Sequence, residues 1–148
     1  MEKKKFLVLD VETANGVNCP LVYDLGFAVC DKYGKIYEKQ SMLIYEVYRG
    51  ERELMNSCYY ANKIPEYEEQ IKRGETKIVR FFTAWKIIRD TMKKYNIDTI
   101  AAYNCNFDRN ALNNTIRYLT KSEYRWFFPY NTKYMCISKD FSKVCKEK

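Results

Sequence analysis

The octapeptide from Phe6 to Thr13 constrains the fold more than any other stretch, because an apolar run ends abruptly in two acids. Phe6 to Leu9 is typical of a buried strand, apolar on both faces, in the middle of a sheet that helices cover. Asp10 and Glu12 are spaced i, i+2, so on a strand both carboxylates lie on one face. Such neighbours raise each other's pKa unless a cation lies between them. The stretch therefore predicts either a site for a hard divalent ion or two solvated loop acids after a core strand.

A second stretch of the same kind favours the ion site. Thr99 to Tyr103 predicts another strand, and the polar segment from Asn104 to Asp108 follows it, where a helical pattern begins. Asn104 or Asn106 is suited to cap that helix. Asp108 has a second interpretation as an ordinary helix-start acid, because negative charge is favoured in the first turn of a helix.

The chain between these stretches predicts a mixed α/β arrangement. Residues 22–30 and 35–45, joined by a turn at 31–34, form a hairpin pattern, which gives an antiparallel meander with the acid-bearing strand first. A helix is predicted over 78–95, with an apolar face of Ile78, Phe81, Phe82, Trp85, Ile88 and Met92. A strand reached through a crossover helix should lie parallel to its partner. The two acidic stretches would then meet at the carboxyl ends of adjacent strands, where open α/β sheets have their sites.

The other segments give weaker patterns. Residues 48–77 predict short helices and loops on one side of the sheet, with amphipathic pieces at 51–60 and 66–73. The helix near Asp108 has an apolar face of Leu112, Ile116 and Leu119. Residues 126–130 predict an apolar anchor, residues 134–137 a short fifth strand, and residues 138–148 a basic tail.

Composition limits the class of protein. A chain of 148 residues, residues 1–148, suits one domain. It has no histidine, which excludes a histidine base or a Ser-His nucleophile. Its six cysteines include no C-x-x-C pair, which favours free buried thiols in a reducing compartment over zinc ligands. No stretch has the length of a membrane helix or the pattern of a signal peptide, so we expect a cytoplasmic protein.

The formal net charge of +7 is spread along the chain. A basic surface around an acidic pocket suits a polyanion that approaches a metal site. A solvated, lysine-rich surface with no such partner explains the charge equally well.

Two motifs, Val8-Leu9-Asp10-Val11-Glu12-Thr13 and Tyr103-Asn104-Cys105-Asn106-Phe107-Asp108, occur in this order with the predicted crossover helix between them. Together they resemble the first two motifs of the DEDD family of 3′-to-5′ exonucleases, which includes the proofreading subunit of bacterial replicative DNA polymerase. The segment 23–29 looks like the family's second strand. The resemblance spans residues 5–137 and implies a ribonuclease H-like α/β fold: a mixed sheet of three antiparallel strands plus parallel strands, flanked by helices.

The resemblance also implies roles for individual residues. Asp10, Glu12 and Asp108 would be the catalytic residues and would hold two Mg²⁺ or Mn²⁺ ions at the 3′ end of a single-stranded DNA or RNA. The remaining motif residues would contact the terminal nucleotide or support the site, namely Val11, Thr13, Asn104 and Phe107. A polymerase or another replication protein is the partner that the family suggests.

The third family motif, a fourth aspartate preceded by histidine or tyrosine on a late helix, is not found. The chain ends 40 residues after Asp108 (148 minus 108), and the surroundings of Asp140 do not match. We therefore expect a chain that is C-terminally truncated relative to the family and lacks its last helix. Without the general base, hydrolysis would be slower by about 10² to 10⁴ or absent, and metal binding would be weak. Apolar sheet surface left uncovered would favour a homodimer.

Two other functions remain open from the sequence. One is a non-catalytic module of the same fold that binds nucleic acid or a protein without cutting it. The other is an unrelated α/β protein whose acids are solvated.

Overall fold

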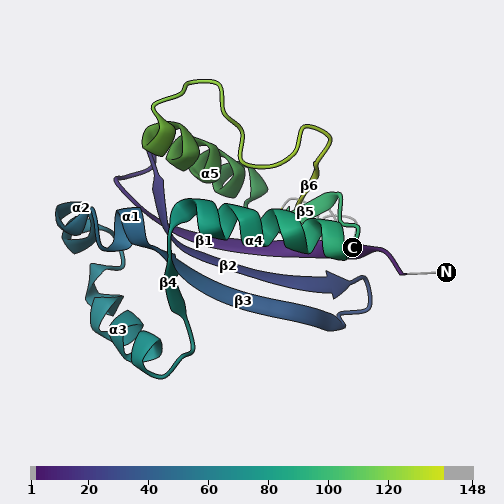
Figure 1. Ribbon diagram of the computed structural model, residues 1–148, viewed down its shortest axis with the longest axis horizontal. Helices are drawn as coiled ribbons and strands as arrows, with labels where there is room; N and C mark the ends of the chain where they lie inside the picture. The colour runs from purple at the N-terminus through teal and green to yellow at the C-terminus, as the bar shows by residue number, and fades with distance from the viewer. Residues whose placement is uncertain (1–2, 139–148) are drawn as a thin grey trace.

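Within residues 3–138, six strands form one mixed sheet in the order β4-β3-β2-β1-β5-β6 (Figure 1). The computed structural model describes residues 3–138. The strands are β1 (Lys5–Ala14), β2 (Leu21–Asp31), β3 (Ile36–Ile44), β4 (Lys77–Val79), β5 (Thr99–Ala102) and β6 (Lys133–Cys136). The chain is therefore an α/β protein with a mixed sheet, as its sequence predicts.

The predicted strand directions are confirmed. β1 pairs antiparallel with β2, and β2 pairs antiparallel with β3, which gives the meander. The β2–β3 turn contains Gly34 at a φ of +84°, a conformation that glycine adopts without strain. β5 is parallel to β1, and β6 is parallel to β5. The carboxyl ends of β1, β5 and β6 therefore point the same way.

Strand β4 is a difference from the predicted helix over 78–95. Ile78 and Val79 pair in parallel with β3, so helix α4 (Phe81–Lys94) begins at Phe81. Arg80, with φ −69° and ψ 151°, is still extended. The Glu46 carboxylate accepts the Phe81 N–H at 2.9 Å and so satisfies one free donor of the helix start. Ile78 and Val79 are β-branched and stand next to an apolar helix face, so they fit a strand as well as a helix. The helix predicted from the sequence therefore begins too early.

The remaining helices are α1 (Tyr45–Tyr48), α2 (Arg52–Ser57), η1 (Ala61–Lys63), α3 (Ile64–Lys72) and α5 (Cys105–Thr120). In Figure 1, α1, α2 and α3 gather at the end of the sheet where β1 finishes, while α4 lies across the sheet. α4 and α5 share one hydrophobic core with one face of the central strands. Its fully buried members include Leu7, Leu25, Phe81, Ile88, Leu112, Ile116 and Phe127.

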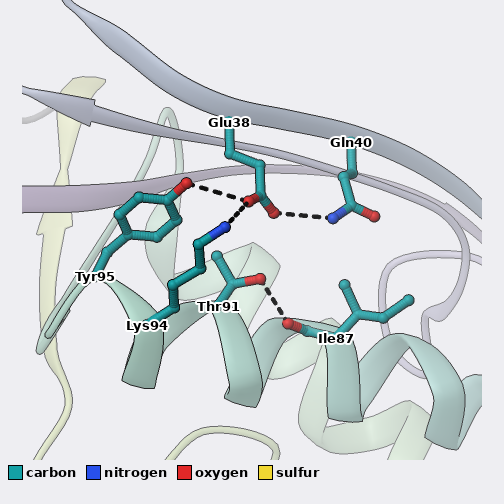
Figure 2. A network of polar contacts seen from close by, with 6 residues as sticks. All are labelled: Glu38, Gln40, Ile87, Thr91, Lys94 and Tyr95. Atoms are coloured by element: carbon teal, nitrogen blue, oxygen red, sulfur yellow. Dashed lines mark hydrogen bonds and ion pairs between the residues drawn. The ribbon is translucent and has the colours of Figure 1, made fainter.

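The carboxyl end of α4 is tied to β3 by a polar network around Glu38 (Figure 2). The Glu38 carboxylate accepts hydrogen bonds from the Gln40 amide at 2.9 Å and from the Tyr95 hydroxyl at 3.2 Å, and it pairs with the Lys94 ammonium at 3.5 Å. The Gln40 bond contributes most to holding the pKa of Glu38 below its ordinary value, and Tyr95 and Lys94 add to the effect. The network fixes the position of α4 on the sheet.

Several sequence expectations concern exposure. Cys105 is the buried one among the free thiols of residues 3–138, whereas Cys19 is exposed and Cys30 and Cys58 are half-buried, so the expectation of uniformly buried thiols is wrong.

Within residues 3–138, no helix is both long enough and apolar enough to span a membrane. The predicted basic tail beyond Ser138, and the question of a last helix, lie outside the described residues.

Candidate functional site

Strand β1 holds the first two acids and is longer than predicted. It continues to Ala14, so Asp10 and Glu12 lie within the strand rather than after it. Leu7, Leu9 and Val11 are buried against the helices, while Asp10 is exposed and Glu12 is half-buried. The two carboxylates therefore share a face, as the alternation of a strand requires. Phe6 and Val8, on this same face, are only half-buried, so the expectation of a strand buried on both faces is wrong.

The third acid comes from the start of α5. β1 pairs with β5 through Leu7–Ile100 and Val8–Ala101, so Asp10 follows the paired part of β1 just as Tyr103 follows that of β5. α5 then begins at once, and its first turn contains Asp108, whose side chain is 8% exposed. The two acidic stretches therefore meet at the carboxyl ends of two parallel strands, as the sequence predicts.

The asparagine cap is correct in position, because Asn104 is the N-cap residue, but the side-chain bond expected of a cap is not made. α5 begins at Cys105, so Asn104 occupies the N-cap position and Asn106 lies within the first turn. The Asn104 side chain makes no capping hydrogen bond; only its backbone carbonyl accepts the Asp108 N–H, at 3.2 Å. The exposed amide of Asn104 remains available to solvent or to a ligand.

The three carboxylates influence one another electrostatically. Burial, and then the charges of Asp10 and Glu12, raise the pKa of Asp108 to about 7. Burial and the charge of Asp10 also raise the pKa of Glu12, while the nearby Lys63 ammonium opposes this rise. No group among residues 3–138 donates a hydrogen bond to the Asp108 carboxylate.

A fourth carboxylate, Asp24 on β2, belongs to the same cluster. Asp24 pairs with Glu12 across the two strands. Its Oδ2 accepts a hydrogen bond from the Tyr67 hydroxyl of α3 at 3.1 Å. Burial raises the pKa of Asp24, the Tyr67 hydrogen bond lowers it, and the charges of Glu12 and Asp10 raise it again, so that the net value is about 6.

Sequence reasoning missed Asp24 as a site residue, although a signal was present. In a hairpin, alternate residues of the second strand share the face of the first strand's acids. Leu25, Phe27 and Val29 are buried on the helix side, which leaves Asp24, with Gly26 and Ala28, on the acidic face. The visible clue was Asp24 as the one acid inside the apolar run from Leu21 to Cys30.

A β-bulge shapes this corner. Glu12 pairs with Asp24 but Thr13 pairs with Val22, so Tyr23 is the extra residue of β2. Bulges re-aim side chains and are frequent beside functional sites. The ring of Tyr23 packs edge to face against Tyr67, with centroids 5.9 Å apart, and so supports the residue that holds Asp24.

A cavity of about 220 Å³ opens next to this corner, between the sheet and η1–α3. It is lined by Glu12, Asp24, Tyr60, Lys63, Glu66, Tyr67 and Gln70. The Lys63 ammonium lies 4.4 Å from the centroid of the Tyr60 ring. The cavity thus offers a cation, aromatic rings and an amide immediately beside two of the carboxylates.

The residues predicted to contact substrate lie in different environments. Val11 is 6% exposed and belongs to the core on the face opposite Asp10. Thr13 is half-buried just beyond the register shift, and Phe107 is half-buried in the first turn of α5. Of this set, Asn104 alone is exposed.

The donor chemistry of the cluster suits a hard divalent cation, because Mg²⁺ and Mn²⁺ prefer carboxylate oxygens. The side chains are not yet arranged as a formed metal centre. Within residues 3–138, no three His, Cys, Asp or Glu side chains are close enough together to hold an ion. A cation would have to draw the carboxylates together. Asp140, the other downstream aspartate, lies outside the described residues.

A comparison with models of known protein families finds no match to this chain, and a comparison with curated proteins finds none either. Any assignment of the protein to a functional class must therefore be argued from its fold and from the carboxylate cluster.

Proposed function

We propose that this chain is a metal-dependent 3′-to-5′ exonuclease domain of ribonuclease H-like fold, which hydrolyses phosphodiester bonds at the 3′ ends of nucleic acids. The observation that carries the proposal is the Asp108 carboxylate, buried beside Asp10 and Glu12 without a hydrogen-bond donor among the described residues. Two neighbouring negative charges and partial burial disfavour the ionised form of this carboxyl group. A bound cation would remove that penalty.

In this proposal Asp10, Glu12 and Asp108 hold Mg²⁺ or Mn²⁺. Two such ions would supply a hydroxide for attack and stabilise the departing 3′ oxygen. The chain's own residues bind and orient the strand. Lys63, beside Glu12, is placed to attract a phosphate, and the net charge of +7 favours approach of a polyanion.

The test is a calorimetric Mn²⁺ titration, followed by incubation with an end-labelled single strand. Asp10→Asn removes one central charge while keeping the side-chain shape. Asp90→Asn, at an exposed position of α4, is the matched control. We expect the unaltered chain and Asp90→Asn to bind Mn²⁺ and shorten the strand stepwise, and Asp10→Asn to do neither. Equal metal binding by Asp10→Asn and the unaltered chain would refute the proposal.

A non-catalytic nucleic-acid-binding module is the second candidate. It is favoured by the absence of a ready three-ligand group among residues 3–138, and by the lack of histidine. In that case Asp10→Asn would bind a single strand as well as the unaltered chain does, no shortening would occur, and affinity would fall steeply with salt.

A further inference from the structure

The connection between α5 and β6 displays aromatic rings outside the carboxylate cluster. Residues 126–130 were predicted to be an apolar anchor, but only Phe127 and Phe128 are buried. Trp126 on one side of them is 64% exposed, and Tyr130 on the other is fully exposed. Large rings are rarely left in water without a function when they gather in one place.

The exposed rings stand on a fixed backbone. The Phe127 N–H donates to the Asn113 side-chain oxygen at 2.8 Å. The Phe127 carbonyl accepts from the Trp85 indole at 3.2 Å and from the Arg89 guanidinium at 2.8 Å. Because Phe127 is tied to both α4 and α5, its neighbour Trp126 is presented without the entropy loss of ordering a free loop.

These rings border a cavity of about 280 Å³, which we call the aromatic pocket. It is lined by Arg109, Trp126, Phe128, Pro129, Tyr130 and Tyr134. The Arg109 guanidinium lies 5.0 Å from the centroid of the Tyr134 ring. Its Nε is buried and has no hydrogen-bond partner among the described residues. The pocket therefore combines flat apolar surfaces with the positive charge of the Arg109 guanidinium.

The net positive charge of the segment that forms the aromatic pocket indicates which class of ligand suits it. From Arg109 to Tyr134 the chain has five basic residues, Arg109, Arg117, Lys121, Arg125 and Lys133, and one acidic residue, Glu123. The Arg117 guanidinium lies 4.9 Å from the Trp126 ring centroid. Aromatic platforms interleaved with arginines are the means by which proteins bind single-stranded nucleic acids without sequence preference. A peptide partner would need acidic residues to suit this surface, whereas every nucleobase has a planar face that can stack on the exposed rings.

We propose that the aromatic pocket binds a nucleobase of a single-stranded nucleic acid, stacked on Trp126 and Tyr130 and hydrogen-bonded by Arg109. The inference rests on the proposed function for the class of partner. Arg109 directly follows Asp108 on α5, so the pocket and the carboxylate cluster each take a side chain from the first turns of this helix. The pocket would hold the strand, while the carboxylates act on its end.

The test measures binding in EDTA, where no divalent ion is present, using labelled twelve-nucleotide oligothymidylate and oligouridylate. We expect either probe to quench tryptophan fluorescence, and the quench to be lost in Trp126→Phe, in which Trp85 alone remains. Tyr130→Ala should weaken binding by about five- to hundredfold, the usual effect of removing one stacking ring. Arg109→Gln should weaken binding without lowering the slope of log affinity against log salt, because its proposed contact is to a base and not to a phosphate.

Tyr33→Ala is the matched control, because Tyr33 is also an exposed ring with lysines over it but lies in the β2–β3 turn. It should leave the affinity unchanged. No quench with either probe, or equal losses in Tyr33→Ala and Tyr130→Ala, would overturn the proposal. Self-association of the chain that Tyr130→Ala abolishes, without any change in oligonucleotide affinity, would overturn it too and would assign the pocket to an interface between copies.

The two proposals fail separately. Binding in EDTA that depends on Trp126 but is never followed by shortening with Mn²⁺ would sustain the pocket and refute the exonuclease. Shortening that is unaffected by Tyr130→Ala, with no quench of Trp126, would refute the pocket alone.

Discussion

Asp31 and Asp108 are both buried aspartates, 4% and 8% exposed, yet their surroundings are opposite. Asp31, at the β2–β3 turn, accepts the Tyr33 and Lys35 N–H groups at 2.9 and 3.2 Å and the Tyr37 hydroxyl at 2.9 Å. Burial raises its pKa, but these bonds outweigh burial, so the pKa of Asp31 lies below its ordinary value. Asp108 receives no donor among residues 3–138, and its pKa rises to about 7.

The opposite pKa shifts distinguish Asp31, whose carboxylate stabilises the fold, from Asp108, whose carboxylate does not. The donors around Asp31 are fixed by its own turn, so the carboxylate stabilises the hairpin. The environment of Asp108 consists of two more carboxylates, which destabilise its charged form. Such an arrangement persists where function compensates for lost stability, which supports the proposed ion site.

The largest effect is expected from Asp31→Ala. The substitution removes the three hydrogen bonds by which Asp31 closes the turn, with two backbone N–H groups and the Tyr37 hydroxyl. We expect the Tm to fall by about 5–10 °C, measured by thermal unfolding at pH 7. Asp90→Asn is the control and should leave the Tm unchanged. A Tm for Asp31→Ala within 1 °C of the unaltered chain would contradict the structural role of Asp31.

Asp108→Asn should have the opposite effect. At pH 8, where Asp108 is ionised, the substitution removes a buried charge without a donor, so we expect stability to rise by about 1–3 kcal/mol. The Tm would rise by about 2–4 °C for each kcal/mol. Saturating Mn²⁺ should raise the Tm of the unaltered chain and leave that of Asp108→Asn unchanged. A lower Tm for the variant than for the unaltered chain would show that Asp108 supports the fold.

The two regions should also give opposite pH dependences. Asp31 has a lowered pKa, so its stabilisation is present above the unfolded-state value of 3.8 and is lost as the pH falls through the folded pKa. Asp24 and Asp108 have raised pKa values, about 6 and about 7, so the folded state keeps protons that the unfolded state releases. Stability contributed by these two groups therefore falls as the pH rises from 3.8 to about 7.

We expect a stability maximum near pH 4–5 in the absence of metal, followed by a decline to about pH 7. Urea unfolding across this range tests the prediction. Asp108→Asn should flatten the decline. A curve that rises steadily to pH 7 would be incompatible with the raised pKa values.

The smallest effect is expected from Tyr67→Phe, which removes only the hydroxyl that bonds Asp24. Stability should fall by about 0.5–1.5 kcal/mol, the usual contribution of one hydrogen bond. The pKa of Asp24, followed by carboxyl carbon NMR, should rise above about 6, because the bond lowers it in the unaltered chain. Tyr60→Phe, in the same cavity, should leave the pKa unchanged. If both variants shifted it equally, the Tyr67 contact would not be specific.

Local sequence patterns predicted the elements that depend on neighbouring residues. The alternation of β1, the hairpin turn at Gly34 and the apolar face around Ile88 each reflect backbone geometry within a few residues. The parallel placement of β1 and β5 also followed, because a crossover helix leaves few other arrangements. The start of α4 did not follow, since only pairing with β3 decides that Ile78 is a strand residue.

The candidate site was predicted in part. Asp10, Glu12 and Asp108 stood out because each follows an apolar run. Asp24 was missed because its place in the cluster depends on the strand register, and Tyr67 because α3 gives almost no sequence signal. The exposure of Trp126 was likewise hidden, since an apolar pentapeptide does not tell which of its rings reach the core.

The sequence by itself determined which residues carry charge, which are apolar and how they alternate, and therefore every described strand except β4, the two main helices and three of the carboxylates. Only the tertiary structure decided which carboxylates receive donors. A hydrogen bond to Asp31 comes from its own turn, whereas the surroundings of Asp108 come from β1, nearly a hundred residues earlier in the chain. Burial and charge act through space, so a pKa depends on distances that residue order alone does not fix.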